Sequence, residues 1–206
     1  FFHEITHHII YTDDELYSFI HEYAHDEKAF KTTLEAFCNI GAAEFLLPSA
    51  KISQLITQDE FSITLIEKID QAFFASKPAI AIQLAQCAVH ACIIVVCERQ
   101  MVSQLAANQT VPKTNINAQE PQLRVLYSSS SPACKYTSGR FVSIPSNHLI
   151  AEVYRSKQLM KGSAPIPFHT GRIWEQPCEA FYYRGKVYAA FNLSDPPSPL
   201  QMSFNF

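Results

Sequence analysis

The chain begins Phe1-Phe2-His3-Glu4-Ile5-Thr6-His7-His8, and this stretch contains the pattern H-E-x-x-H. On a helix, residues four positions apart lie on one face about one turn from each other, so His3 and His7 can offer two imidazoles to a single ion. Glu4 stands beside them and can reach a water in an open coordination position, as in the zinc peptidases. Apolar residues flank the motif, and a buried helix does not hold such polar side chains without partners. The pattern therefore predicts a metal site rather than a chance match.

A catalytic zinc ion takes three protein ligands, and three residues compete for the third place. Asp13 stands where a metzincin has its last ligand, but that motif needs a glycine where this chain has Ile10. Glu44 lies later in the chain and could simply be exposed. Glu35 is favoured, because Asn39 follows it by one helical turn on the same face. The Asn39 amide could hold an imidazole or a ligand carboxylate in place without binding the metal itself.

The composition bounds the class of protein. The chain has 206 residues, 48% of them hydrophobic, and a net charge of −3, so no global charge favours nucleic acid or an anionic membrane. No apolar run approaches the roughly 20 residues of a membrane span, and a histidine-rich acidic helix is no signal peptide. The six cysteines form no C-x-x-C pair, which favours free thiols and a cytoplasmic location.

The first half of the chain shows helical periodicity almost throughout. Asp13 and Asp14 are expected to break the first helix and cap the second. Polar residues gather at the end of the second helix, namely His21, Glu22, His25, Asp26 and Glu27, and most of them are expected to be solvated. One of His21, Tyr23 or His25 could face the metal. The expected helices cover residues 1–11, 15–24, 27–47, 51–57, 61–73 and 79–90.

The last two of these helices have the order of a helix-turn-helix, with Ser76 as a cap and Pro78 in a first helical turn. A DNA reader needs lysines and arginines on its second helix, and residues 79–90 have none. Residues 51–90 have a net charge of −1, from three lysines against four acidic residues. This region is therefore interpreted as a structural or protein-docking module.

The second half predicts a small α+β domain. A continuous β-branched run at 91–97 predicts a buried strand, and a polar stretch at 103–121 predicts a linker. Arg184-Gly185 predicts the turn of a hairpin. Further strands are expected at 123–127, 135–144 (broken at Ser138-Gly139), 164–168 (a proline-rich edge), 179–183 and 186–193. A helix is expected at 147–156 and a loose tail at 196–206.

Two motifs together resemble a known family. H-E-I-T-H-H-I-I is followed, 28 residues after His7, by E-A-F-C-N-I-G-A-A-E-F-L-L-P. This pair is similar to the ImmA/IrrE-type zinc metallopeptidases, above all to the Deinococcus IrrE branch. The resemblance implies that His3, His7 and Glu35 bind zinc and that Glu4 is the general base. It also implies an α+β fold with a helical zincin-like part.

The resemblance further implies a domain order: a partial metallopeptidase at 1–50, a helix-turn-helix-like region at 51–102, a linker at 103–121 and a GAF-like domain at 122–195. In the family a sheet before the first motif shapes the substrate cleft. Only two residues precede His3, so we expect that sheet to be missing from this chain. Possible sensor or docking residues of the GAF-like domain are Lys135, Tyr136, His169 and Arg172.

The function implied by the resemblance is a zinc-dependent endopeptidase, in which Mn²⁺ could also support activity. Its protein substrate would be a helix-turn-helix repressor of the XRE type, cut to switch on a stress or DNA-damage response. Neither direct DNA binding nor a membrane is expected. The alternative is a metal-stabilised regulator that binds a transcription factor without cutting it. A third and weaker hypothesis is DNA binding through residues 61–90.

Overall fold

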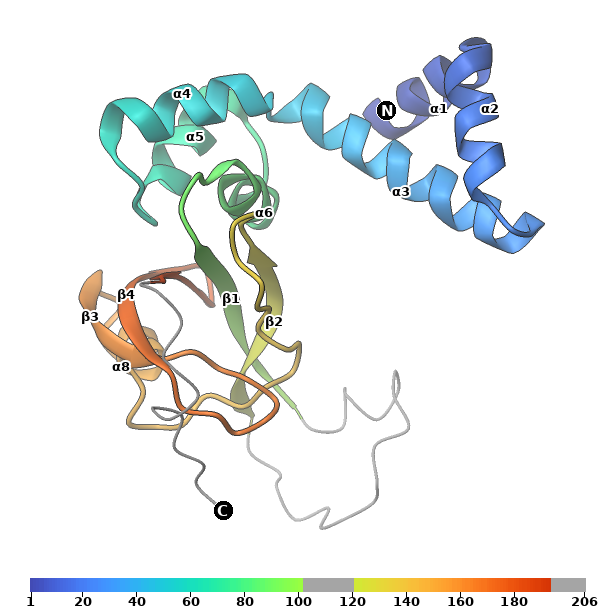
Figure 1. Ribbon diagram of the computed structural model, residues 1–206. Coiled ribbons are helices and arrows are strands. Elements are labelled where there is room, and N and C mark those ends of the chain that lie inside the picture. Colours follow the sequence, from blue (N-terminus) through green and yellow to red (C-terminus); the bar gives the residue numbers. More distant parts are fainter. Residues whose placement is uncertain (102–120, 194–206) are drawn as a thin grey trace.

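The computed structural model describes residues 1–101 and 121–193, and these ranges form an α+β structure as expected (Figure 1). They contain seven helices and one five-stranded antiparallel sheet. None of the helices in these ranges is long and apolar enough to cross a membrane. The predicted linker and tail lie outside the described residues. The elements are α1 (Phe2–Thr12), α2 (Asp14–Tyr23), α3 (Glu27–Leu46), α4 (Ser49–Asp59), α5 (Leu65–Phe73), α6 (Lys77–Cys87), β1 (Cys92–Gln100), β2 (Gln122–Ser130), α8 (Leu149–Ser156), β3 (Met160–Pro165), β4 (Glu175–Tyr183) and β5 (Lys186–Asn192).

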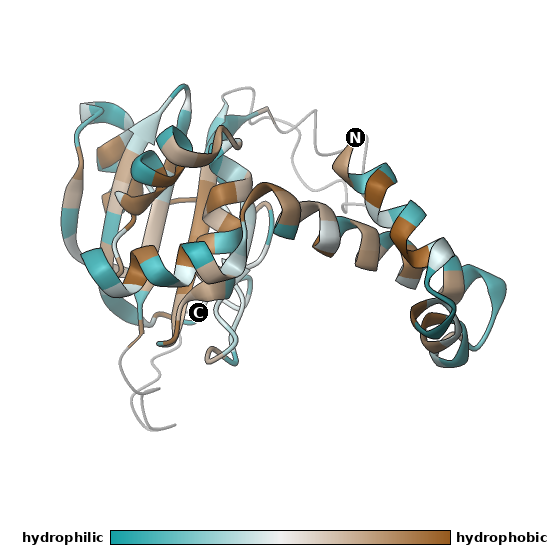
Figure 2. Ribbon diagram, turned by 90° about the horizontal axis from the view of Figure 1, so that it is seen from above, coloured by the Kyte–Doolittle hydropathy of each residue, from teal (hydrophilic) through white to brown (hydrophobic). Residues whose placement is uncertain are grey.

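The sheet has the order β2-β1-β5-β4-β3, with β1 fully buried over most of its length. Side chains of β1 alternate between two cores, as the period of two of a strand requires. Ile94 and Val96 face the core made with α4, α5 and α6, whereas Ile93 and Val95 face the core made with α8. Figure 2 shows the brown, hydrophobic strands between helices whose residues alternate between teal and brown.

Helix α6 lies against the sheet and is largely covered. Six of its eleven residues are buried, among them Lys77. The Lys77 ammonium is bonded to the Asp70 carboxylate and lies 4.3 Å from the centroid of the Tyr183 ring, so the buried charge is paired. A helix-turn-helix would need this helix to be presented to a DNA groove, and here most of it faces protein.

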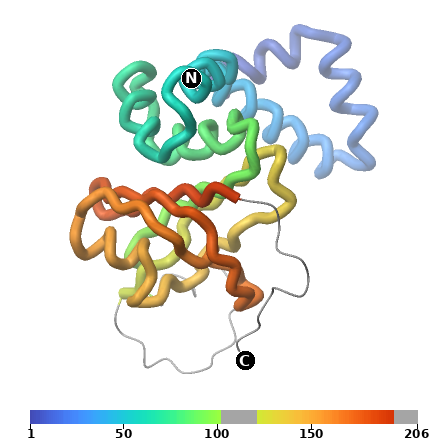
Figure 3. The backbone as a smooth tube through the Cα atoms, turned by 60° about the vertical axis from the view of Figure 1, so that its left-hand side comes forward, coloured from blue at the N-terminus to red at the C-terminus, as the bar shows by residue number. Residues whose placement is uncertain are grey.

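Helices α1, α2 and α3 form a separate group at one end of the molecule (Figures 1 and 3). Their core is small and consists of four buried residues, Ile10, Ile20, Leu34 and Cys38. The group is joined to the rest through the end of α3, where the Leu47 carbonyl accepts a hydrogen bond from the Gln83 amide at 3.0 Å. Helix α3 therefore connects the two parts of the described structure.

Helix α1 packs antiparallel to α3, and the absence of a side chain at Gly41 allows a close approach. The Phe2 and Phe45 rings stack at 5.9 Å near one end. At the centre, a Cβ added to Gly41 would lie 2.4 Å from Thr6 Cγ2. Only a residue without a side chain fits there, and this contact sets the distance between the two helices.

Several predicted boundaries are confirmed. Asp13 and Ser76 cap α2 and α6 through their side-chain oxygens, and α3 ends directly before Leu47 and Pro48. The hairpin of β4 and β5 turns at Arg184-Gly185, and both residues have positive φ. The edge position of the proline-containing strand is also confirmed, because β3 ends the sheet.

Other predictions were wrong. The strand expected at 135–144 does not form. Its residues run beside β2 with a few backbone hydrogen bonds, but the φ of +67° at Phe141 interrupts the extended conformation. The edge strand covers Met160–Pro165 instead of 164–168, because Pro165 and Pro167 have no N–H for a ladder. Helix α6 ends at Cys87 rather than His90 because Ala88 is extended, and α5 begins at Leu65 rather than Phe61.

His148 begins α8 and is held in its neutral form. The side chain is 5% exposed. Its Nδ1 accepts a hydrogen bond from the Ile150 N–H at 3.1 Å, so the proton sits on Nε2, which donates to the Pro165 carbonyl at 2.8 Å. Burial lowers the pKa of His148, and the bond to Pro165 opposes this only in part.

This lowered pKa predicts an acid-sensitive stability. Below its ordinary pKa of about 6.5, the unfolded chain takes up a proton that the folded protein resists. The contribution of His148 is therefore complete above about pH 6.5 and is lost as the pH falls through the folded-state pKa. We expect His148→Asn, which keeps a capping oxygen, to flatten the fall in the free energy of unfolding between about pH 7 and pH 5. Parallel urea-unfolding profiles for the two proteins would contradict this role.

The Gly41 contact predicts a rescue experiment. Gly41→Ala should lower the free energy of unfolding by about 1–3 kcal/mol, because the new methyl group overlaps Thr6. Thr6→Ala removes the overlapping atoms and leaves a Cβ 3.2 Å from the new methyl group, so the double variant should recover part of the loss. Thermal unfolding followed by circular dichroism measures both. Additive losses in the double variant would show that the two helices do not meet here.

Candidate metal centre

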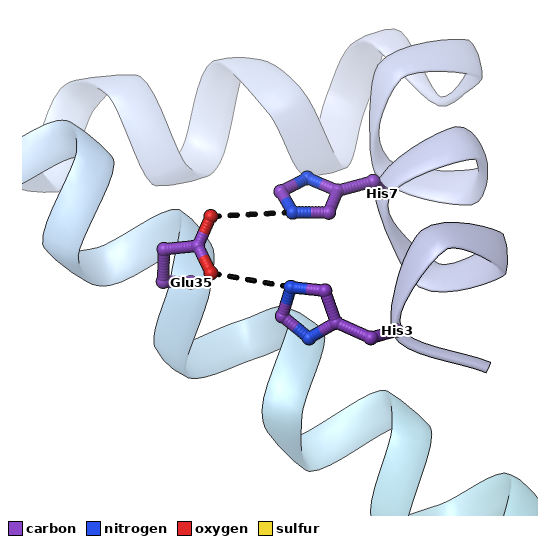
Figure 4. Close-up of side chains that lie close together, drawn as sticks. All are labelled: His3, His7 and Glu35. Carbon is purple, nitrogen blue, oxygen red and sulfur yellow. Dashed lines mark ion pairs between the residues drawn. The ribbon is translucent and has the colours of Figure 1, made fainter. Parts of the chain in front are cut away.

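Three side chains from α1 and α3 converge on one point (Figure 4). His3 Nε2 lies 3.2 Å from one oxygen of Glu35, and His7 Nε2 lies 3.3 Å from the other. The two imidazole rings lie 4.8 Å apart at 77° to each other. One ligand atom from each of the three residues can be chosen so that all lie within 4.8 Å of one another. The structure thus brings together the two histidines of the motif and the favoured third ligand.

The two nitrogen–oxygen distances, each to a different oxygen of Glu35, are near those between zinc ligands. Ligand atoms about 2.0–2.2 Å from a tetrahedral ion lie roughly 3.3–3.6 Å from one another. The two nitrogen–oxygen distances of 3.2 and 3.3 Å are close to that separation. Two imidazoles and one carboxylate also match the ligand set of a zinc peptidase, which leaves a fourth position for water or substrate.

The solvent exposure of the three side chains increases from one side of the site to the other. The side chains of His7, His3 and Glu35 are 17%, 30% and 56% exposed. His7 is backed by the Tyr11 ring, which stacks on it at 5.9 Å and 14°. His7 Nδ1 is buried and has no hydrogen-bond partner among the described residues. A metal-bound imidazole normally donates this second N–H, so His7 has one bond left to make.

Glu4 is exposed and directly follows His3 on α1. The pKa of the buried Cys38 thiol is raised by burial and, further, by the negative charges of Glu35 and Glu4. Both carboxylates therefore lie close enough to Cys38 to act on it. Glu4 is not one of the three residues that converge, and its role as general base stays a prediction.

The two rival ligands are used elsewhere. Asp13 accepts a hydrogen bond from the Leu16 N–H at 2.9 Å and so caps α2. Glu44 accepts from the Ser49 N–H at 2.9 Å and from the Ser49 hydroxyl at the start of α4. Each carboxylate supports a helix end, where a negative charge is favourable, rather than the histidine pair.

The other residues near the site have mixed positions. Asn39 is exposed one turn after Glu35, and its predicted role in holding a ligand stays a prediction. The His21 ring lies 5.4 Å from Phe30 and belongs to a different cluster. Tyr23 is exposed and packs on Phe19. In the described structure none of the three candidates from the end of α2 joins the histidine pair.

The predicted sensor residues lie in the sheet part, around Trp174. The Tyr136 ring meets Trp174 edge-on at 5.2 Å. His169 is exposed and lies so close to Gly139 that a Cβ there would overlap its ring. Lys135 and Arg172 are exposed. Their role in sensing or docking stays a prediction.

Sequence reasoning missed the row of aromatic rings that begins at His7. The rings of Tyr11 and Tyr17 lie 5.8 Å apart, and Tyr17 meets Phe30 edge-on at 5.5 Å. Tyr11 stands four residues after His7, and this helical spacing was a signal for its stacking on the ligand. Tyr17 and Phe30 come from other helices, and no local pattern predicts that they meet.

Two curated proteins are similar to this chain over most of its length. The radiation response metalloprotease IrrE of Deinococcus radiodurans is 29% identical over 200 residues, which cover 94% of this chain. IrrE of Deinococcus deserti is 27% identical over 192 residues, or 93% of the chain. This chain is similar to both IrrE proteins over most of its length. The predicted resemblance to the ImmA/IrrE family is therefore confirmed.

The likeness to IrrE has limits. The chain spans 58% and 64% of the length of the two relatives, so the activity and substrates of those whole proteins come to this chain only as proposals. No family model matches the chain. A transcriptional regulator of Mycobacterium tuberculosis aligns with 92% of the chain and 51% of its own, at 14% identity and a TM-score of 0.42. A likeness at that level supports no conclusion about function.

The cluster predicts which carboxylate binds metal. Glu35→Gln should weaken zinc binding by at least about 100-fold, more than the 10- to 100-fold typical of residues that only support a ligand. Asp13→Asn is the matched control, because it removes the rival carboxylate but keeps an oxygen that caps α2. Isothermal titration calorimetry with zinc measures both affinities. Equal affinities for Glu35→Gln and wild type would exclude Glu35 as a ligand.

Proposed function

We propose that the protein is a zinc-dependent endopeptidase. The observation that carries this proposal is the convergence of His3, His7 and Glu35, with Glu4 next to His3 in the chain. The similarity to proteins named radiation response metalloproteases supports it. A peptidase acts on a protein substrate, and the open side of the cluster, at Glu35, leaves room for a peptide to approach.

The chemistry follows from the roles of the four residues. His3, His7 and Glu35 would hold zinc, which when bound lowers the pKa of a water towards about 7 and polarises a peptide carbonyl. Glu4 would accept the proton of the attacking water oxygen as that oxygen bonds to the carbonyl carbon. Glu4 would then deliver the same proton to the leaving amide nitrogen as the C–N bond breaks. One water is consumed, and Glu4 ends in its starting form.

The substrate that we propose is a helix-turn-helix repressor of the XRE type, cut to release a stress or DNA-damage response. The support is the family resemblance together with the radiation response in the relatives' name. The protein would act in the cytoplasm, where its six free cysteines would stay reduced. Zinc is the proposed metal, and manganese could also support activity.

The sheet part would sense a signal or dock the partner, as a GAF-like domain. The surface around Lys135, Tyr136, His169 and Arg172 is the proposed place. Exposed polar residues stand there over a buried aromatic group formed with Trp174. Helices α4, α5 and α6 would serve as a structural or docking module.

Glu4→Gln gives the direct test of catalysis. The variant should keep its zinc affinity, because Glu4 is not a ligand, but cleavage should fall by at least 100-fold, since general acid–base catalysis contributes about 10²- to 10⁴-fold. Wild type and variant, with any residues that precede Phe1 in the natural protein, are incubated with XRE-type repressors of the same genome and zinc or manganese. Mass spectrometry locates any product.

One metal-dependent cut that is absent with Glu4→Gln supports the endopeptidase and gives its site. Retained cleavage in the variant would remove Glu4 from the mechanism. No cut by wild type, with metal bound and the repressor still captured, would favour the regulator that binds without cutting.

A further inference from the structure

A pocket lies between the end of α2 and the first two turns of α3, and we call it the α2–α3 pocket. It encloses about 460 Å³ and is open to solvent. One side is formed by the rings of Tyr17, His21 and Phe30. The other lining residues are Ala24, His25, Asp26, Glu27 and Lys31.

A row of aromatic rings connects the pocket to the group of His3, His7 and Glu35, which we call the metal cluster. Starting at His7, the row passes to Tyr11 at 5.9 Å and on to Tyr17 at 5.8 Å. Tyr17 then lines the pocket together with Phe30, at 5.5 Å. The Tyr17 ring therefore lies no more than about 12 Å from the His7 ring.

Helix α3 gives the same connection independently. Glu27, Lys31 and Glu35 are spaced by four residues, so they form one stripe along the helix. With a rise of 1.5 Å per residue, the two pocket residues lie about 6 and 12 Å from Glu35 along the axis. An extended peptide advances about 3.3 Å per residue. A substrate that lies along α3 would thus reach the pocket two to four residues from the bond that is cut.

The lining favours a positively charged side chain. Asp26 and Glu27 carry two negative charges against one positive charge on Lys31. Asp26 Oδ1 accepts from the Ala29 N–H at 2.7 Å, and Glu27 Oε1 accepts from Lys31 at 2.7 Å. Each carboxylate keeps a second oxygen that can accept further hydrogen bonds. The faces of Tyr17 and Phe30 can also attract a cation.

We propose that the α2–α3 pocket binds an arginine or lysine side chain of the protein substrate, two to four residues from the cut bond. This rests on the proposed endopeptidase function and adds a specificity-determining subsite to it. The aliphatic stem of the side chain packs on the rings, and its charged end meets the carboxylates of Asp26 and Glu27. The pocket thus selects the stretch of substrate that is aligned with the metal cluster.

The test uses the repressor whose cut has been located by mass spectrometry. The residue at each position from two to four on either side of the cut is changed in turn to Arg, Leu or Glu, and kcat/KM is measured. At one of these positions the wild-type protein should cut the Arg form about three- to thirtyfold faster than the Leu form, and the Glu form slowest.

The pocket variant is Asp26→Asn with Glu27→Gln. Asparagine caps a helix as well as aspartate does, so α3 should still begin at the same place. This double variant should bring the Arg-to-Leu ratio close to one. Asp14→Asn with Glu15→Gln is the matched control, because it removes the same two charges from the start of α2, outside the pocket. The control should keep the wild-type ratio.

The outcomes separate the two proposals. Cleavage with no preference for Arg at any tested position would overturn the pocket inference and leave the endopeptidase standing. A preference for Glu would show that the pocket takes an acidic side chain and would also overturn it. Equal loss of preference in the control variant would assign the effect to overall charge. If wild type cuts no form of the repressor, the proposed function fails, and the inference that rests on it fails too.

Discussion

The approach of α1 to α3 is the contact on which the metal cluster depends. Two imidazoles from α1 meet one carboxylate from α3, and neither helix can form the cluster alone. The contact at Thr6 and Gly41 fixes how near the helices come. The shared core is small, with four buried residues and four partly buried apolar residues packed against them. A metal bound between them would therefore also stabilise the group, since binding energy at such a site is folding energy.

The position of a carboxylate along its helix decides whether it accepts hydrogen bonds from backbone N–H groups. Carboxylates at helix starts, such as Asp13 and Asp26, accept backbone N–H groups that would otherwise have no partner. Glu35 stands in the middle of α3, where every backbone N–H is already bonded within the helix, so its carboxylate is free to face the histidines. Helix α3 ends at Leu46, and the next residue, Leu47, is buried in the core shared with the sheet. Helix α3 thus contributes residues to the α2–α3 pocket and to the metal cluster, and it leads into the junction with the sheet part.

Local signals predicted much of this arrangement. The spacing of His3 and His7 predicted that both side chains lie on one face of α1. Periodicity alone could not choose among Asp13, Glu35 and Glu44, and the position of Asn39 favoured Glu35. Where an outcome depends on tertiary contacts, the sequence was less informative. The stretch 135–144 has the composition of a strand, but the left-handed backbone at Phe141 interrupts it. The burial of α6 follows from the sheet that covers it, and the meeting of Tyr17 with Phe30 depends on how three helices pack.

X-ray absorption spectroscopy at the zinc edge of the zinc-loaded protein tests most directly whether His3, His7 and Glu35 bind the metal. A site made by His3, His7 and Glu35 predicts nitrogen and oxygen neighbours only, at about 2.0–2.2 Å, with the multiple-scattering signature of two imidazoles. Sulfur neighbours at about 2.3 Å would place the metal at cysteines instead. A shell without imidazole would likewise contradict the convergence of His3, His7 and Glu35 as the metal centre.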